Sequence, residues 1–276
     1  MPCTSNQGHP SVIRITLSYL FRVSAALEPI ISLKVGDSYP LTFMKIFEAH
    51  TEIDAFLNNS VFAATLRSCR NSDNLLINGL IAIMQNKKFD RELDFHEIYP
   101  VTTQTPQFKT ELLAELGVLP AYFVSQKESF DTITLLDDGV KLFPSELSNK
   151  VPEALFDIAE AGKALAYEIP TACGFHIFRA TESVLRKYYS HSTGGSPPPK
   201  VRNIGVYVRM LRAQNCGDEI VLATLQQLAR LHRNPLIHPE AVLTMDEAIA
   251  TLGIARSVVT AMLKILPVVL PTTGAA

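Results

Sequence analysis

Helical periodicity, interrupted at defined points by prolines and glycines, is the feature that most constrains the second half of this chain. After Pro144, apolar residues recur at the three- and four-residue spacing of amphipathic helices almost to the end of the sequence. The segment TGGSPPPK at 193–200 breaks this pattern, because two glycines and three consecutive prolines are incompatible with a helix or a central strand. We therefore expect a helical bundle over residues 151–268, followed by a flexible tail over 269–276.

Capping signals predict where these helices begin and end. The expected helices span 153–168, 171–190, 201–213, 218–233 and 245–266. Pro170 suits the first turn of the second helix, because a proline at that position loses no helical hydrogen bond. Thr244 and Glu247 form the Thr-x-x-Glu pattern of a capping box before the last helix.

The first half of the chain is expected to form a separate mixed domain over residues 1–150, mostly helical and of unknown fold. Apolar spacing predicts helices over 44–57 and 73–85, whereas the first forty residues show no clean period. Between Leu119 and Phe143, β-branched and aromatic residues surround an Asp-Asp-Gly turn signal at 137–139, which predicts a hairpin or short sheet. The expected fold class is mainly α with a small β element.

Composition and charge exclude several classes of protein. With 276 residues and 47% hydrophobic content, the chain can bury a core without disulfides. The 25 Lys and Arg residues against 27 Asp and Glu give a net charge of -2, so any contact with nucleic acid must be local. Charged residues make up only 19% of the chain, which favours a surface covered by a partner or a second copy.

Metal, cofactor and membrane signals are weak or missing in the sequence. The four cysteines are too scattered for a zinc site or a disulfide framework, and no Gly-rich phosphate loop occurs. His96 stands beside Asp94 and Glu97, a grouping that fits a metal site but is more typical of a solvated surface. We find neither a signal-peptide pattern nor an apolar run of ~20 residues. A cytoplasmic protein with no cofactor, no metal and no membrane contact is expected.

The stretch LHRNPLIHPE at 231–240 carries the candidate chemistry. Arg233 lies at the edge of an apolar helical stripe, and Pro235 ends that helix. Pro239 restricts His238 to extended geometry, so the two prolines reduce the entropic cost of holding the histidine in one place. The same spacing also fits a structural role, in which the arginine complements the helix dipole and the histidine caps carbonyl groups.

The expected helix at 171–190 adds polar residues to this picture. Four large side chains define the stripe expected to face the core: Phe175, Phe178, Leu185 and Tyr189. Glu182 falls within the stripe, and a buried carboxylate needs a partner. Arg179 and Arg186 stand at pairing distance along the helix, so the three form either support for a neighbouring site or a structural ion cluster. Arg230 is a further candidate for RNA binding, whereas His232 is expected to pack in the core.

Arg233, Asn234 and His238 match the RN-x3-H form of an Arg-x4-6-His motif, and residues 150–268 resemble the HEPN superfamily of helical nucleases. The resemblance implies a metal-independent endoribonuclease in which these three residues are catalytic. It also implies a homodimer whose two motifs face each other across a cleft. Such nucleases serve as toxins or in anti-phage defence by abortive infection, with tRNA among their substrates and an antitoxin or other regulator as partner. Residues 1–150 would then act as a sensor or regulatory domain.

The residue types agree with RNA cleavage by attack of the 2′-OH. This reaction needs a base, an acid and a cation for the charged phosphorane. His238 titrates in the range suited to either proton transfer, and Arg233 offers a planar fork for phosphate oxygens. Asn234 can orient the histidine or bind the phosphate. Two other functions remain open: a non-catalytic helical module that dimerises or binds a nucleotide, and nucleotide-group transfer, for which the chain lacks a phosphate loop.

Overall fold

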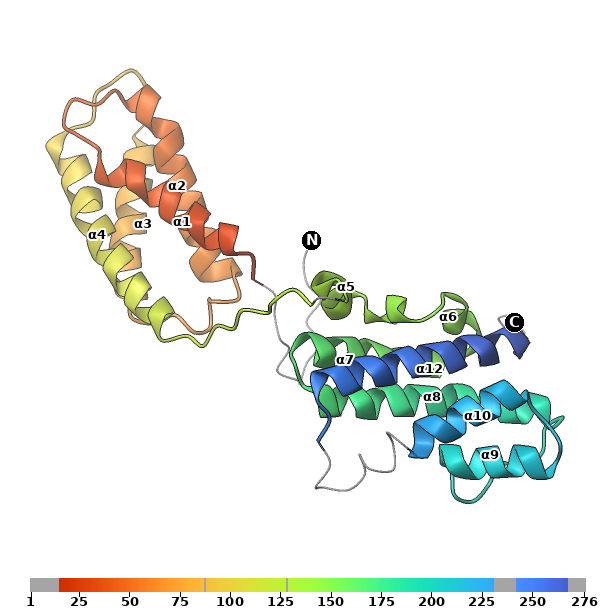
Figure 1. Ribbon diagram of the computed structural model, residues 1–276. Coiled ribbons are helices and arrows are strands. Elements are labelled where there is room, and N and C mark those ends of the chain that lie inside the picture. The colour runs from red at the N-terminus through yellow and green to blue at the C-terminus, as the bar shows by residue number, and fades with distance from the viewer. Residues whose placement is uncertain (1–14, 87, 128, 231–241, 268–276) are drawn as a thin grey trace, which may run out of the picture. The chain divides into compact units, whose positions relative to one another are not determined.

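The chain divides into two compact helical units, with the boundary in the sequence between Ala121 and Tyr122 (Figure 1). The computed structural model describes residues 15–86, 88–127, 129–230 and 242–267. The boundary lies earlier than the position near residue 150 expected from the sequence. The reason is burial, because Leu135, Leu142 and Leu147 belong to the core of the second unit.

Four helices form the first unit: α1 (Leu17–Ile31), α2 (Tyr39–Asn59), α3 (Cys69–Gln85) and α4 (Phe95–Gly117). Each packs against two others in the cyclic order α1, α2, α3, α4, so all four surround one apolar core. The helices predicted over 44–57 and 73–85 lie within α2 and α3, and α3 ends at Gln85 as predicted.

Proline explains why the sequence pattern did not predict α1 and α4. Pro29 lies inside α1, and Pro100 and Pro106 lie inside α4. Each interior proline removes a helical hydrogen-bond donor at a cost of ~3 kcal/mol, which argues against a helix when only the sequence is considered. Burial of one face of α4 in the core offsets this cost.

The acidic pair beside His96 caps a helix. The backbone N–H of Glu97 donates to Asp94 Oδ1 at 2.9 Å, and the N–H of Asp94 donates to Glu97 Oε2 at 3.2 Å, which completes a capping box at the start of α4. His96 itself is exposed. Within the described residues, no three His, Cys, Asp or Glu side chains are grouped to hold a metal ion.

The hairpin expected between Leu119 and Phe143 is wrong. The later part of this segment forms the short helices α5 (Thr132–Asp137) and η1 (Gly139–Leu142), and its only described β pairing is an isolated bridge between Lys127 and Phe130. Asp131 caps α5 by accepting from the N–H of Thr134 at 2.8 Å. The β-branched residues were misleading because their apolar neighbours are buried against a helix instead of a second strand.

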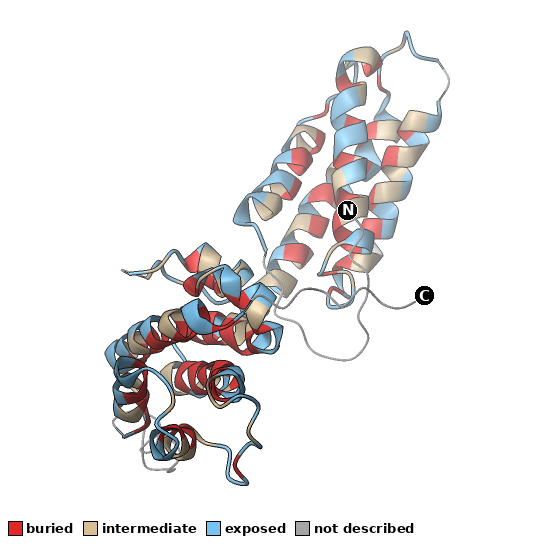
Figure 2. Cartoon of the chain, turned by 90° about the vertical axis from the view of Figure 1, so that its right-hand side faces the viewer, coloured by how far each residue is buried: buried red, intermediate tan, exposed pale blue. Residues whose placement is uncertain are grey.

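The second unit is a helical bundle built around α8 (Pro170–Ser192). Besides α5 and η1, it contains α6 (Glu146–Lys150), η2 (Pro152–Ala154), α7 (Leu155–Ala166), α9 (Ile204–Ala213), α10 (Glu219–Leu228) and α12 (Met245–Ile265). α8 packs against α7, α9 and α12, and buried residues lie on the facing sides of the helices (Figure 2). The predicted helix order, the loop at 193–200 and Pro170 at the start of α8 are confirmed.

α12 begins where the sequence predicts. The N–H of Glu247 donates to Thr244 Oγ1 at 3.2 Å and the N–H of Thr244 donates to Glu247 Oε2 at 2.8 Å, so the capping box is present. By length and hydropathy, α12 could cross a bilayer, and it is the one described helix of which this is true. Its inward side, which includes Leu252, Val259 and Met262, packs in the core of the bundle.

Close approach of α5 to α7 depends on Gly162. A Cβ atom at this position would lie 2.7 Å from the carbonyl oxygen of Leu135 and 3.1 Å from Cα of Gly139. Only a residue without a side chain allows the backbone of α5 and η1 to lie directly on α7. This contact ties the segment after residue 121 to the second unit.

Candidate functional site

The predicted motif lies outside the described residues, together with its histidine neighbour: Arg233, Asn234, His238 and His232. Arg230, just before this segment, is exposed beyond the end of α10. Just after it, the backbone N–H of Leu243 donates to Oγ1 of Thr171 at 3.2 Å. Because Thr171 belongs to the first turn of α8, the chain that leaves the motif is attached at the start of that helix.

α8 turns a polar face to solvent, referred to below as the open face. Its members are Phe175, His176, Arg179, Glu182, Arg186 and Lys187. The prediction that Phe175 faces the core is therefore wrong, since Phe175 is 44% exposed, whereas Glu182 is half-buried. Small residues, among them Gly174 and Ala180, occupy the buried side and rotate the helix from the orientation that the large side chains suggest.

A buried carboxylate holds two polar residues of the open face. Asp157 on α7 is 5% exposed, and its Oδ1 lies 2.9 Å from Nδ1 of His176. The Arg179 Nε lies 3.1 Å from the same oxygen, while its side chain is 65% exposed. The sequence interpretation did not identify Asp157 or His176, although it did identify Arg179.

This arrangement leaves reactive groups accessible. With Nδ1 of His176 at the carboxylate, Nε2 has no hydrogen-bond partner among the described residues, and the side chain is 26% exposed. An aspartate at Nδ1 fixes the ring orientation and favours the tautomer in which Nε2 accepts a proton. Arg179 uses Nε for the aspartate, so its terminal nitrogens remain for an anion. A proton acceptor and a cation therefore stand side by side.

The remaining predicted residues lie further along the same face. Arg186 donates from Nη2 to Oγ of Ser183 at 2.8 Å, and Lys187 lies 3.4 Å from a carboxylate oxygen of Glu153. Glu182 lies between the two arginines in sequence and is half-buried. Its predicted pairing with both arginines stays a prediction, whereas the partner of Arg179 is Asp157.

The nearby Cys173 is buried and does not share the open face with His176. Cys173 lies three residues before His176 on α8, a spacing at which a Cys-His pair could form. Burial raises the pKa of the Cys173 thiol to about 12, so the thiolate is scarce at neutral pH. The chemistry of this face therefore depends on the imidazole and the guanidinium groups.

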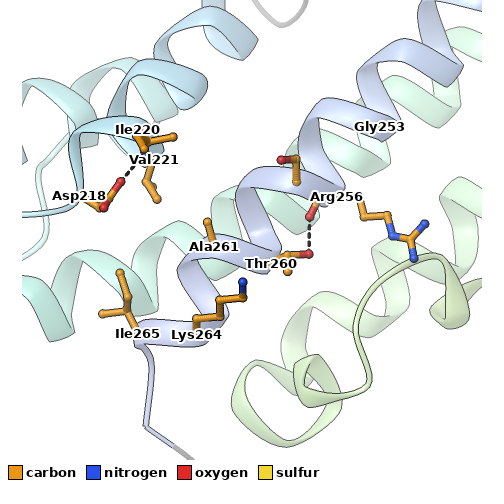
Figure 3. Close-up of a pocket in the computed structure, with 10 residues that line it drawn as sticks. Asp218, Ile220, Val221, Gly253, Arg256, Thr260, Ala261, Lys264 and Ile265 are labelled. Atoms are coloured by element: carbon orange, nitrogen blue, oxygen red, sulfur yellow. Dashed lines mark hydrogen bonds between the residues drawn. The ribbon is translucent and has the colours of Figure 1, made fainter.

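A groove lies between α10 and α12 (Figure 3). This groove has a volume of about 630 Å³. Its lining combines cations, hydroxyls and apolar side chains: Arg256, Lys264, Ser257, Thr260, Ile220 and Ile265. The sequence interpretation did not single out any of these residues.

The first unit has an apolar groove of about 340 Å³, lined by residues of α1, α2 and α4. Phe21 and Leu113, which contribute to it, are 76% and 61% exposed. Lys109 lies at this groove and pairs with Glu28. The unit thus offers a surface suited to an apolar partner.

Comparison with known proteins adds no assignment, because the chain matches no family model, no curated sequence and no solved structure.

Proposed function

We propose that this protein is a metal-independent endoribonuclease. The observation that carries the proposal is the accessible imidazole of His176, oriented by the buried carboxylate of Asp157 and flanked by Arg179. The helix that carries this group also receives the chain leaving the motif of Arg233, Asn234 and His238, through the Leu243–Thr171 hydrogen bond. The motif offers the same types of side chain, an imidazole and a guanidinium, and the proposal assigns both sets to one reaction.

RNA supplies its own nucleophile, which is why these residues are sufficient. A base takes the proton of the 2′-OH while its oxygen bonds to phosphorus, and an acid protonates the 5′ oxygen as its bond to phosphorus breaks. Guanidinium groups stabilise the charge of the phosphorane. The products are a 2′,3′-cyclic phosphate and a 5′-hydroxyl. In our proposal Arg233 and His238 are catalytic, Asn234 positions them, and His176 is a second imidazole for proton transfer.

This second imidazole changes the role proposed for a dimer. With only His238, acid and base would come from two copies of the chain across a twofold axis. With His176 as well, one chain holds both proton-transfer groups. We still propose a homodimer, since only 19% of the residues are charged and several large apolar side chains are exposed.

The biological setting and the partners are part of the same proposal. A toxin or anti-phage effector must be kept inactive until needed, and the first unit, with its apolar groove, is suited to receive a regulator or antitoxin. RNA, with tRNA among the candidates, is the proposed substrate, and Arg179, Arg186 and Arg230 are the proposed phosphate contacts.

A specific observation also favours a non-catalytic module that dimerises or binds a nucleotide. Asp157 is buried and needs compensation, so His176 and Arg179 serve it even if no substrate binds. The two functions differ in their dependence on the 2′-OH. We expect the protein to cleave an RNA strand and to leave the same strand intact when every 2′-OH is methylated. Binding of both strands without cleavage of either would favour the non-catalytic module.

A further inference from the structure

Two cations on α12 contribute to the lining of the groove between α10 and α12. Arg256 and Lys264 both line it, and neither has an ion-pair partner among the described residues. They stand two helical turns apart on α12, which places their Cα atoms ~12 Å apart along the axis. Asp218, the acidic residue of the lining, caps α10, where its Oδ1 accepts from the N–H of Val221 at 3.0 Å, so the lining carries two cations and one carboxylate.

Small residues leave the floor of the groove open. Gly253 and Ser257 are exposed and Ala261 is half-buried on the face of α12 that lines the groove, and a Cβ atom added at Gly253 would meet nothing within 4 Å. Figure 3 shows Arg256 on the side of α12 away from α10, and Lys264 reaching across the front of the helix. A chain of phosphates can therefore lie against α12 between two cations without a large side chain in its path.

Apolar side chains complete the groove on the α10 side. Ile220 is 77% exposed and Ile265 is 43% exposed. A nucleic-acid strand presents charged phosphates on one edge and apolar base faces on the other. The two cations of the groove match the phosphates, and the two exposed isoleucines match the base faces.

Charge argues against a second copy of the chain as the occupant. Packing of α12 on α12 across a twofold axis near Thr260 would set each Arg256 opposite the Lys264 of the other copy. Like charges directly opposed destabilise such an interface. An extended polyanion meets no such repulsion.

We propose that the α10–α12 groove binds the backbone of single-stranded RNA, with Arg256 and Lys264 on phosphates. The ligand class rests on the proposed ribonuclease function, and the groove would hold a part of the strand away from the site of cleavage. Such a contact does not read sequence, so it positions RNA of any sequence on the bundle.

Binding of a strand that cannot be cleaved tests this proposal separately from catalysis. The probe is a labelled RNA of about twelve nucleotides with 2′-O-methyl groups throughout, followed by fluorescence anisotropy on the full chain over a range of salt concentrations. The groove variant is Arg256→Gln/Lys264→Gln. The matched control is Lys141→Gln/Lys163→Gln, which removes two exposed lysines of the same unit that pair with Asp138 and Glu160.

We expect the groove variant to bind at least about tenfold more weakly, and the slope of log K against log salt to fall in magnitude by about 1.4, the value for two phosphate contacts to a single strand. The control should bind within about twofold of the natural protein. Ser257→Lys should strengthen binding and Ser257→Glu should weaken it, because this exposed position lies on the groove floor.

Three results would overturn the proposal. The first is a groove variant that binds with unchanged affinity and salt slope. The second is an equal loss in the control, which would indicate a general effect of charge. The third is conversion of a dimer to a monomer by the groove variant in light scattering, which would assign the groove to self-association. Failure to cleave natural RNA would contradict the proposed function without affecting the binding result.

Discussion

The Nδ1 atom of His176 lies 2.9 Å from a carboxylate oxygen of Asp157, a residue that is almost fully buried between α7 and α8. The pair joins two helices and turns an imidazole towards solvent. In the proposed reaction, the orientation that Asp157 gives the His176 ring affects the rate of RNA cleavage.

Replacement of His176 and replacement of Asp157 should both lower the rate of RNA cleavage, but by different factors. His176→Gln removes proton transfer and is expected to reduce the rate by about 10²- to 10⁴-fold, whereas Asp157→Asn keeps the ring but loses its orientation and is expected to cost at least about tenfold. The nitrogen chemical shifts of His176 should report one fixed hydrogen-bonding arrangement of the ring in the natural protein and a mixture in Asp157→Asn. His50→Gln, in the first unit, is the control. Unchanged cleavage in His176→Gln would reduce the pair to a structural contact.

Two glycine-to-alanine changes should act in opposite directions on stability. Gly162→Ala forces a Cβ to within 2.7 Å of the Leu135 carbonyl oxygen, so the second unit should lose about 2 kcal/mol or more of unfolding free energy. Gly253→Ala lies in the middle of α12 with open space around it and should add about 0.5–1 kcal/mol. Urea unfolding followed by circular dichroism measures both. Equal effects of the two changes would contradict the contact between α5 and α7.

Asp73 should make the first unit less stable as pH rises above 4. Burial raises its pKa from 3.8 to about 6, although Arg70 opposes the shift, and Oδ1 is buried without a hydrogen-bond partner among the described residues. The native state holds the proton more tightly than the unfolded chain, so this stability is complete below pH ~4 and is lost as pH rises through 6. Asp73→Asn should remove this loss and raise the unfolding free energy at pH 7 by about 1–3 kcal/mol. A natural protein whose stability is flat between pH 4 and 6 would refute the assignment.

Glu115 should make the first unit more stable as pH rises from 2 to 4.5, the opposite of the effect of Asp73 at higher pH. Burial would raise its pKa, but backbone N–H groups of Ser68 and Arg67 outweigh this and lower it from 4.5 to about 2. The carboxylate thus caps the start of α3, with N–H to oxygen distances of 2.5 and 2.9 Å. Its stabilisation is present above pH ~4.5 and is lost as pH falls towards 2. Glu115→Gln should cost about 1 kcal/mol at pH 7 and little at pH 2. Urea unfolding of the natural protein and Glu115→Gln at both pH values measures this difference, and an equal loss at pH 7 and pH 2 would contradict the capping role.

The elements that sequence predicts well are those whose ends are marked by local chemistry. Thr244 with Glu247 and Pro170 each act on a neighbouring turn of the same helix, so their effect can be predicted without knowledge of the fold. α4 forms although Pro100 and Pro106 argue against a helix in the sequence. These prolines are tolerated because the other face of the helix is buried.

The candidate site was only partly predictable for a similar reason. Arg179, Glu182 and Arg186 share one helix, so their spacing identified them. Asp157 and His176 are on different helices, and nothing between them in sequence connects them. The spacing of the two residues is nevertheless a signal. Asp157 lies ten residues before Tyr167, and His176 lies nine residues after it. When two antiparallel helices are joined by a turn at Tyr167, residues at nearly equal distances from the turn lie side by side.

The most direct test of metal-independent cleavage is incubation of RNA with the purified full chain in EDTA, followed by analysis of the product ends. The natural protein is compared with His238→Ala, Arg233→Ala and His176→Gln, each first shown to be folded. We expect cleavage by the natural protein, 2′,3′-cyclic phosphate and 5′-hydroxyl ends, and strong loss of cleavage in all three variants. Cleavage that requires a divalent metal, or that continues undiminished in His238→Ala and Arg233→Ala, would contradict it.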